Sequence, residues 1–132
     1  MNRSVIIVDD DNFTLYINQE ILEPIISTTW KTFLGAKAAL VFLEAYVNEE
    51  SQLLIFLDLN MPLMNGWQFL DELKTSKFQA NIFVVIVTSS IDQRDSFRAL
   101  EYPYVHGFIS KPLEEKTVLA LAEIPQLSFF FK

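Results

Sequence analysis

Polar side chains that suit phosphoryl-transfer chemistry follow directly on short predicted strands of this chain. They are Asp9, Asp10, Asp58, Thr88 and Lys111. An aspartate carboxylate can attack phosphorus to give an acyl phosphate, and a lysine ammonium is a point donor suited to phosphate. Positioning and charge neutralisation do most of the work in such transfers. We interpret Asp58 as the candidate nucleophile, because it alone stands between the acidic pair and the Thr/Lys side.

The three carboxylates also predict a metal. If the strands lie in the order 2-1-3-4-5, the first and third strands are neighbours, and Asp9, Asp10 and Asp58 converge where they end. Like charges in a partly desolvated crevice push at least one pKa upward. A hard divalent cation relieves that repulsion, and carboxylate and carbonyl oxygens suit Mg²⁺. Mg²⁺ is therefore the expected cofactor.

The run at residues 53–57 is the stretch around which the rest of the chain is arranged. It is wholly apolar and soon followed by Asn, Pro and Gly, so it is typical of a short strand buried on both faces. In an open parallel sheet, ligands bind in the crevice at the carboxyl ends of the strands. This strand therefore places Asp58 at the expected site.

Strand and helix patterns alternate along the chain. Further strands are expected at residues 5–8, 26–33, 82–87 and 107–110. Helices are expected to begin near residues 12, 36, 67, 92 and 113 and to end near residues 24, 47, 75, 100 and 124. Five such alternations with short connections predict an α/β fold: a doubly wound, five-stranded parallel sheet of flavodoxin-like order 2-1-3-4-5, with helices on both faces.

Two apolar groups lie outside these strands. Phe13, Tyr16, Ile17 and Ile21 recur at helical spacing, which predicts the packing face of the first helix. A short aromatic tail, residues 126–132, contains three consecutive phenylalanines at 129–131. We expect the tail to fold back on the domain or to form a self-association surface.

The composition indicates one domain over residues 1–132. Hydrophobic residues make up 51% and charged residues 20%, which is enough for a core and excludes a disordered chain. A formal net charge of −7 argues against direct nucleic-acid binding. The absence of cysteine excludes disulfides and thiolate metal sites. No apolar segment reaches bilayer length, so we expect a cytoplasmic chain that does not enter a membrane.

Four motifs in the chain resemble the receiver domain of two-component response regulators. They are Val8-Asp9-Asp10, Leu57-Asp58-Leu59-Asn60-Met61-Pro62 followed by Gly66, Val87-Thr88-Ser89 and Ser110-Lys111-Pro112. Each motif alone is a weak signal, but their order and spacing together are specific. The match covers nearly the full chain, so the resemblance implies a receiver-only response regulator.

The resemblance implies a role for each acidic position. Asp58 would accept a phosphoryl group from a phosphohistidine, supplied by a sensor histidine kinase or a histidine phosphotransfer protein. Asp10 and Asp58 would bind Mg²⁺ through side-chain oxygens. Asn60 would bind it through its main-chain carbonyl, and Asp9 mostly through water.

The resemblance also implies a switch. Lys111 would hold the phosphoryl oxygens, and Thr88 would swing its hydroxyl toward them. Phe108 would then change rotamer, although it lacks the hydroxyl of the Tyr often found there. Ser89 stands where Ala or Gly is frequent, and a cis bond is expected before Pro112. The output would be a changed affinity for a downstream protein at the surface of the fourth helix, fifth strand and fifth helix.

Three other readings are open, and the sequence disfavours each. A Mg²⁺-dependent phosphatase with an aspartate nucleophile generally needs a second Asp two residues later, but Asn60 occupies that position. We therefore expect no turnover of an external substrate, only self-catalysed phosphorylation and dephosphorylation of Asp58. A receiver-like module that binds partners without phosphorylation is disfavoured by the intact acidic triad, Thr88 and Lys111. A flavin-binding relative of the fold is disfavoured because three aspartates after the first strand would repel a phosphate.

Overall fold

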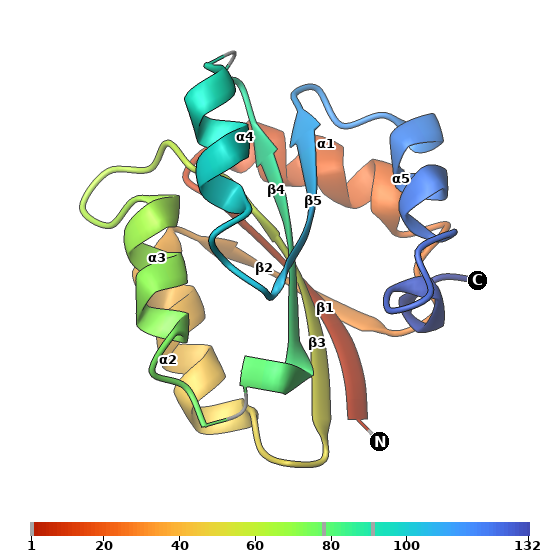
Figure 1. Ribbon diagram of the computed structural model, residues 1–132. Coiled ribbons are helices and arrows are strands. Elements are labelled where there is room, and N and C mark those ends of the chain that lie inside the picture. Colours follow the sequence, from red (N-terminus) through yellow and green to blue (C-terminus); the bar gives the residue numbers. More distant parts are fainter. Residues whose placement is uncertain (1, 78, 91) are drawn as a thin grey trace.

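A computed structural model describes residues 2–77, 79–90 and 92–132, which form a five-stranded sheet flanked by helices (Figure 1). The strands are β1 (Asn2–Asp9), β2 (Thr29–Leu34), β3 (Ser51–Leu57), β4 (Ile82–Thr88) and β5 (Val105–Ser110). The helices are α1 (Asn12–Leu22), α2 (Ala36–Tyr46), α3 (Gly66–Leu73), α4 (Gln93–Ala99) and α5 (Glu115–Leu121). Two 3₁₀ turns, η1 (Gln79–Asn81) and η2 (Ser128–Phe130), complete the list. All strands pair in parallel, in the order β2-β1-β3-β4-β5, so the predicted fold class and strand order are confirmed.

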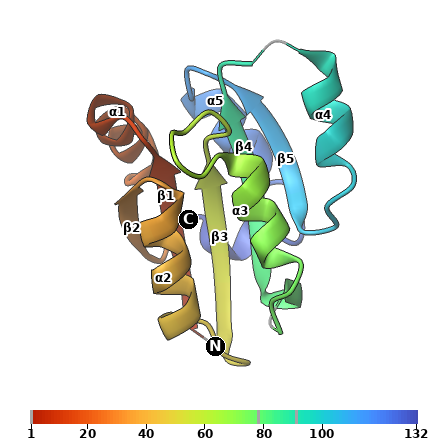
Figure 2. The same ribbon diagram turned by 90° about the vertical axis from the view of Figure 1, so that its left-hand side faces the viewer.

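Helices cover both faces of the sheet and create two apolar layers. Helices α1 and α5 pack on one face, and α2, α3 and α4 pack on the other (Figures 1 and 2). The central strands β1, β3 and β4 are buried along almost their whole length, because their side chains meet helices on either side. Among the described residues, no helix has both the length and the apolar character that crossing a membrane requires.

Several element boundaries differ from the sequence expectation. β1 extends beyond residues 5–8 in both directions, because Asn2 continues the backbone ladder with Ser51. β2 begins at residue 29 instead of 26, since Ile26 forms an isolated antiparallel bridge with Phe131. The last helix is shorter than expected and begins after Leu113, which is itself buried. The Lys111–Pro112 bond is cis, as the resemblance implied.

The predicted packing face of α1 is only partly confirmed: Ile21 packs against the apolar layer and Ile17 is half-buried, but the other two residues are exposed. The structure buries Leu15, Asn18 and Leu22, whereas Phe13 is 70% exposed and Tyr16 is 56% exposed. Both sets of residues recur at helical spacing, so periodicity alone does not choose between them. The choice is made where the helix begins: the Asp11 carboxylate caps it by accepting from the Phe13 amide, which fixes how the helix leaves β1.

The aromatic tail folds back beside the segment that joins α1 to β2. The amide of Lys132 donates to the Ile25 carbonyl (2.9 Å), and the amide of Ser27 donates to the Phe130 carbonyl (3.0 Å). Phe130 is 1% exposed and meets the ring of Phe83 edge-on. Phe129 instead lies 60% exposed beneath the Arg3 guanidinium. The tail therefore completes the apolar layer between the sheet and the helices α1 and α5.

We expect the Phe130→Ala substitution to lower the free energy of unfolding by about 3–5 kcal/mol, because it empties a fully buried aromatic site. Phe129→Ala is the matched control: the same change at the neighbouring exposed ring should cost less than about 1 kcal/mol. Urea denaturation of both variants measures the difference. Equal losses in the two variants would contradict the packing described for the tail.

Candidate functional site

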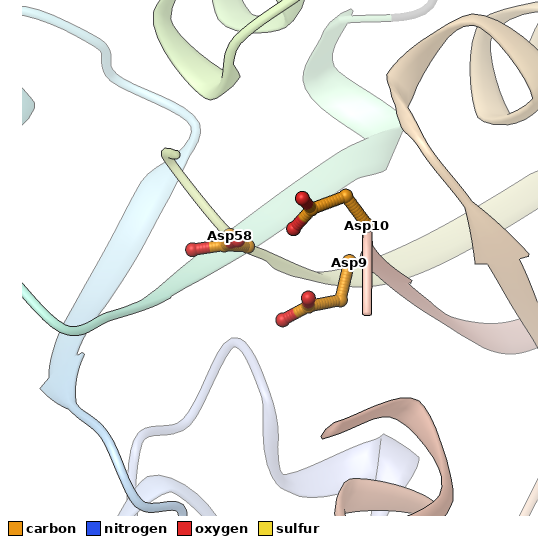
Figure 3. Close-up of side chains that lie close together, drawn as sticks. All are labelled: Asp9, Asp10 and Asp58. Carbon is orange, nitrogen blue, oxygen red and sulfur yellow. The ribbon is translucent and has the colours of Figure 1, made fainter. Parts of the chain in front are cut away.

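The site lies where β1 and β3 end side by side. Val8 pairs with Leu57 in the sheet, and the amide of Asp58 donates to the Val8 carbonyl (3.0 Å). This register brings the residues that follow the two strands next to each other. Carboxylate oxygens of Asp9, Asp10 and Asp58 all lie within 4.8 Å of one another (Figure 3). The structure therefore gathers the three carboxylates that the sequence predicted to converge.

Two of the three carboxylates are buried. Asp9 is 2% exposed and Asp58 is 3% exposed, whereas Asp10 is exposed. A buried carboxylate is costly unless a cation or hydrogen-bond donors compensate it. The amide of Asp11 donates to Asp9 Oδ1 (3.0 Å), and the amide of Asn60 lies 3.4 Å from Asp58 Oδ1. The pocket therefore keeps two negative charges out of water with few neutral donors.

Lys111 supplies the positive charge. Its Nζ lies 2.9 Å from Asp9 Oδ2 and 3.5 Å from Asp58 Oδ1. The neighbouring strand end places it there, because the Lys111 amide donates to the Thr88 carbonyl (2.8 Å) and so extends the pairing of β5 with β4. Burial alone would lower the pKa of Lys111, but its hydrogen bond to Asp9 and the charge of Asp58 raise the pKa above its ordinary value.

Burial and the nearby charge of Asp9 raise the pKa of Asp58 to about 6, although Lys111 and the Asn60 amide act in the opposite direction. The single positive charge of Lys111 therefore does not compensate the negative charge of the carboxylates in the pocket. An added divalent cation would favour the ionised form of Asp58 and remove the repulsion. The donor atoms are hard carboxylate oxygens, which Mg²⁺ and Mn²⁺ prefer. The residues that the structure gathers here fit such a cation.

The loop after β3 is shaped by a glycine. A Cβ atom on Gly66 would lie 2.7 Å from the Asp58 carbonyl oxygen and 2.7 Å from Leu59 Cα, so the first turn of α3 approaches this loop as closely as only glycine permits. Asn65 caps α3, and its side chain and that of Gln68 each accept from the other residue's backbone amide. The Gly66 amide also donates to the Leu59 carbonyl (2.9 Å), so the start of α3 supports the backbone between Asp58 and Asn60.

Thr88 and Phe108 lie at the β4 and β5 side of the site. Thr88 is completely buried, and its hydroxyl oxygen accepts from the Ser90 amide (3.2 Å). Phe108 is half-buried and packs against the apolar layer beneath α2, α3 and α4. The pairing of β4 with β5 shifts by one residue between Val84 and Val85, so that Phe108 lies opposite Ile86, another residue of that layer.

Sequence reasoning missed one part of this region. The Ser90 hydroxyl donates to the Asp95 carboxylate of α4 at 2.5 Å, so the loop after Thr88 is tied to the helix that follows. The signal available in the sequence was a serine two residues after Thr88, just before the predicted helix start near residue 92. Serine hydroxyls commonly make such bonds at helix starts.

The pKa of Asp58 predicts how cation binding depends on pH. Because a metal ligand must be deprotonated, Mg²⁺ should bind roughly tenfold more weakly at about pH 5 than at about pH 7, with the loss setting in below about pH 6. Isothermal titration calorimetry at several pH values measures the affinities. The Asp58→Asn chain should lose this pH dependence along with most of its affinity. An affinity of the parent chain that stays constant between pH 5 and pH 7 would contradict the assignment.

Comparisons with known proteins agree with this geometry. Residues 5–123 match the family described as the response regulator receiver domain. The chain is 28% identical over 119 residues to the chemotaxis protein CheY of Halobacterium salinarum, in an alignment that covers 90% of this chain and 92% of that protein.

Solved structures give the same result. A response regulator receiver protein from Dyadobacter fermentans superposes with a TM-score of 0.79 at 28% identity, covering 92% of this chain and 95% of that one. The Mn²⁺-bound form of the response regulator Rcp1 superposes with a TM-score of 0.72 at 25% identity, covering 96% and 94%. The matched residues 5–123 include all four motifs quoted above, and three of the motifs meet at the lysine-paired carboxylates.

Proposed function

Because the chain belongs to the response regulator receiver family, we propose that it accepts a phosphoryl group on Asp58 and passes the signal on through a changed binding surface. The observation that carries the proposal is the buried Asp58 carboxylate, held between a second carboxylate, Asp9, and the Lys111 ammonium. The phosphoryl donor is a sensor histidine kinase or a histidine phosphotransfer protein. A cytoplasmic location is part of the same proposal.

The transfer is a displacement at phosphorus. A carboxylate oxygen of Asp58 forms the new P–O bond while the P–N bond of the donor phosphohistidine breaks, and the leaving imidazole nitrogen keeps the electron pair and takes a proton from solvent water. Lys111 already contacts the acceptor carboxylate and stays near the phosphoryl oxygens as a fixed positive charge. Bound Mg²⁺ supplies further neutralisation of the charge on the carboxylates and the phosphoryl group.

The metal ligands follow the family pattern. Asp10 and Asp58 would hold the cation with side-chain oxygens, Asn60 would hold it with its main-chain carbonyl, and Asp9 would act mostly through water while it holds Lys111. The acidic cluster and the raised pKa of Asp58 support this assignment. A similar structure, that of the response regulator Rcp1, was solved in its Mn²⁺-bound form, which supports a divalent ion of the same kind here.

The donor docks, in this proposal, beside α1. A mostly apolar hollow lies next to Lys111 and is lined by Phe13, Thr14, Ile17, Asn18, Pro112 and Leu113. The ring of Phe13 is exposed on α1 and does not pack on the sheet. An apolar surface at the mouth of the site suits a protein that must bring a phosphohistidine to Asp58.

The output lies at the α4–β5–α5 surface. Phosphorylation shifts an equilibrium between two conformations, in which the Thr88 hydroxyl turns to the phosphoryl group and Phe108 changes rotamer. The downstream partner is a protein that binds one of the two conformations better. Exposed Phe97, Leu100 and Leu119 on this surface support a protein partner.

We further propose that the chain turns over no external substrate. A phosphatase of the aspartate-nucleophile type generally needs a carboxylic acid two residues after the nucleophile, and Asn60 offers an amide there. The experiment is incubation with acetyl phosphate and Mg²⁺, with the Asp58→Asn chain as the control. We expect at most one labile acyl phosphate per parent chain and none on the variant.

Two results would contradict the proposal. Continued release of phosphate from p-nitrophenyl phosphate or similar monoesters, lost in Asp58→Asn, would identify the phosphatase. A folded parent chain that binds Mg²⁺ but gains no phosphoryl group would identify a binding module that works without phosphorylation.

A further inference from the structure

Helix α4 is held in place by unusually few buried side chains. Ala99 is the one buried residue among the seven of α4, all of which the structure describes. Phe97 is 69% exposed on the same helix. By contrast, α3 buries Phe69, Leu70 and Leu73 as well as Gly66. Elements with few buried contacts are the ones that move at low cost in free energy, so the remaining contacts of α4 decide where it rests.

The C-terminal turn of α4 rests on α3 through a cation–π contact. The guanidinium carbon of Arg98 lies 4.4 Å from the ring centroid of Trp67. Trp67 also stacks on Tyr102 at 5.9 Å, and the Tyr102 hydroxyl donates to the Asp71 carboxylate of α3 (2.7 Å). Trp67 thus sits in an aromatic cluster between α3 and the segment that follows α4, and Arg98 is the residue of α4 that contacts it.

The N-terminal turn of α4 is tied to the switch residue. Asp95 accepts from the Ser90 hydroxyl, and the Ser90 amide donates to the Thr88 hydroxyl oxygen. A movement of that hydroxyl toward the phosphoryl group breaks or lengthens its bond to Ser90. Since Ser90 is bonded to Asp95 in the first turn of a short helix, such a movement would be transmitted to α4.

We propose that Arg98 and Trp67 form a latch that holds α4 against α3 in the resting chain and opens when Asp58 is phosphorylated. The inference rests on the proposed function, since it concerns the conformation that phosphorylation selects. It assigns Arg98 a role in setting the equilibrium between the two conformations, because a contact present in one conformation alone favours that conformation.

The fluorescence of Trp67 can report on the latch. Trp67 and Trp30 are the two tryptophans of the chain, so Trp30→Phe leaves the emission of Trp67 alone. With Mg²⁺ and beryllofluoride, a mimic of the phosphoryl group, we expect the emission spectrum of Trp67 and its quenching by acrylamide to change as Arg98 leaves the ring. The added Asp58→Asn substitution should abolish the change. An unchanged Trp67 signal in a chain that has bound beryllofluoride would overturn the latch.

Substitution of Arg98 tests how strongly the latch favours the resting conformation. Arg98→Gln should tighten apparent beryllofluoride binding by about two- to fivefold, the factor that corresponds to losing one exposed cation–π contact of the resting state. Arg94→Gln is the matched control, because it removes the same charge from the same helix while its partner is Asp92. Arg98→Lys keeps a cation over the ring and should restore most of the parent affinity. Equal affinities of Arg98→Gln and Arg94→Gln would overturn the proposal.

Mass spectrometry after treatment with acetyl phosphate distinguishes failure of the latch from failure of the proposed receiver function. If Asp58 gains a phosphoryl group and the Trp67 and Arg98 results are null, the latch is wrong and the receiver function stands. If Asp58 gains none, the proposed function fails and the latch fails with it.

Discussion

The Asp58→Asn chain is expected to be more stable than the parent by about 3 kcal/mol at about pH 8 without divalent cations. The folded state raises the pKa of Asp58 from 3.8 to about 6, so the folded chain holds this proton more tightly than the unfolded chain. Stability is therefore highest below the unfolded pKa and falls as the pH rises from about 4 to about 6. A neutral amide of the same shape avoids that loss.

The same variant provides its own controls. At about pH 4 both side chains are largely neutral in the folded state, so most of the difference between the two chains should disappear. Saturating Mg²⁺ should stabilise the parent and leave the variant almost unchanged, because the cation binds the charges that the variant lacks. Urea denaturation at the two pH values, with EDTA or with Mg²⁺, measures all four cases. A variant that is less stable than the parent at pH 8 in EDTA would contradict the strained carboxylate cluster.

Lys111→Gln is expected to have the opposite effect on stability. Removal of the ammonium leaves Asp9 buried beside Asp58 with no neighbouring cation, which should cost about 3 kcal/mol at neutral pH in EDTA. That figure is the lower end of the range for a buried pair, chosen because the Lys111 side chain is 22% exposed. Phosphorylation by acetyl phosphate should also fall steeply, since the fixed charge beside the acceptor is gone.

The control for this prediction is Lys74→Gln. Lys74 also pairs with an aspartate, Asp71, but both side chains are about half exposed, so the loss should stay below about 1 kcal/mol. Denaturation of the two variants under the same conditions gives the comparison. If both substitutions cost the same, Lys111 is an ordinary surface lysine and not the counter-charge of the pocket.

The sheet and the acidic site could be predicted from sequence because the signals were local and agreed with one another. The apolar runs before Asp9 and Asp58 had no interpretation other than buried strands, and parallel strands with short crossovers have few arrangements. Once β1 and β3 are neighbours, their carboxyl-terminal residues must meet. Lys111 could be placed in the same way, from a strand end two strands away.

Other features depended on information that sequence periodicity does not contain. Helix α1 carries two apolar stripes, and the geometry of its start at Asp11 decided that Leu15 faces the sheet while Phe13 faces solvent. The position of the tail depended on a long-range antiparallel bridge between Ile26 and Phe131, residues far apart in the chain. The bond from Ser90 to Asp95 depended on how α4 begins. Each of these three features depends on a tertiary contact between two segments of the folded chain.

Chemical mapping of the phosphoryl group tests the central claim most directly. Borohydride reduces an acyl phosphate but leaves free carboxylates intact, so reduction after treatment with acetyl phosphate marks the acceptor as homoserine in a peptide mass spectrum. We predict the mark at Asp58 alone, dependent on Mg²⁺ and absent when EDTA is present. A mark at Asp9 or Asp10, or an equal yield at Asp58 without a divalent cation, would contradict the account.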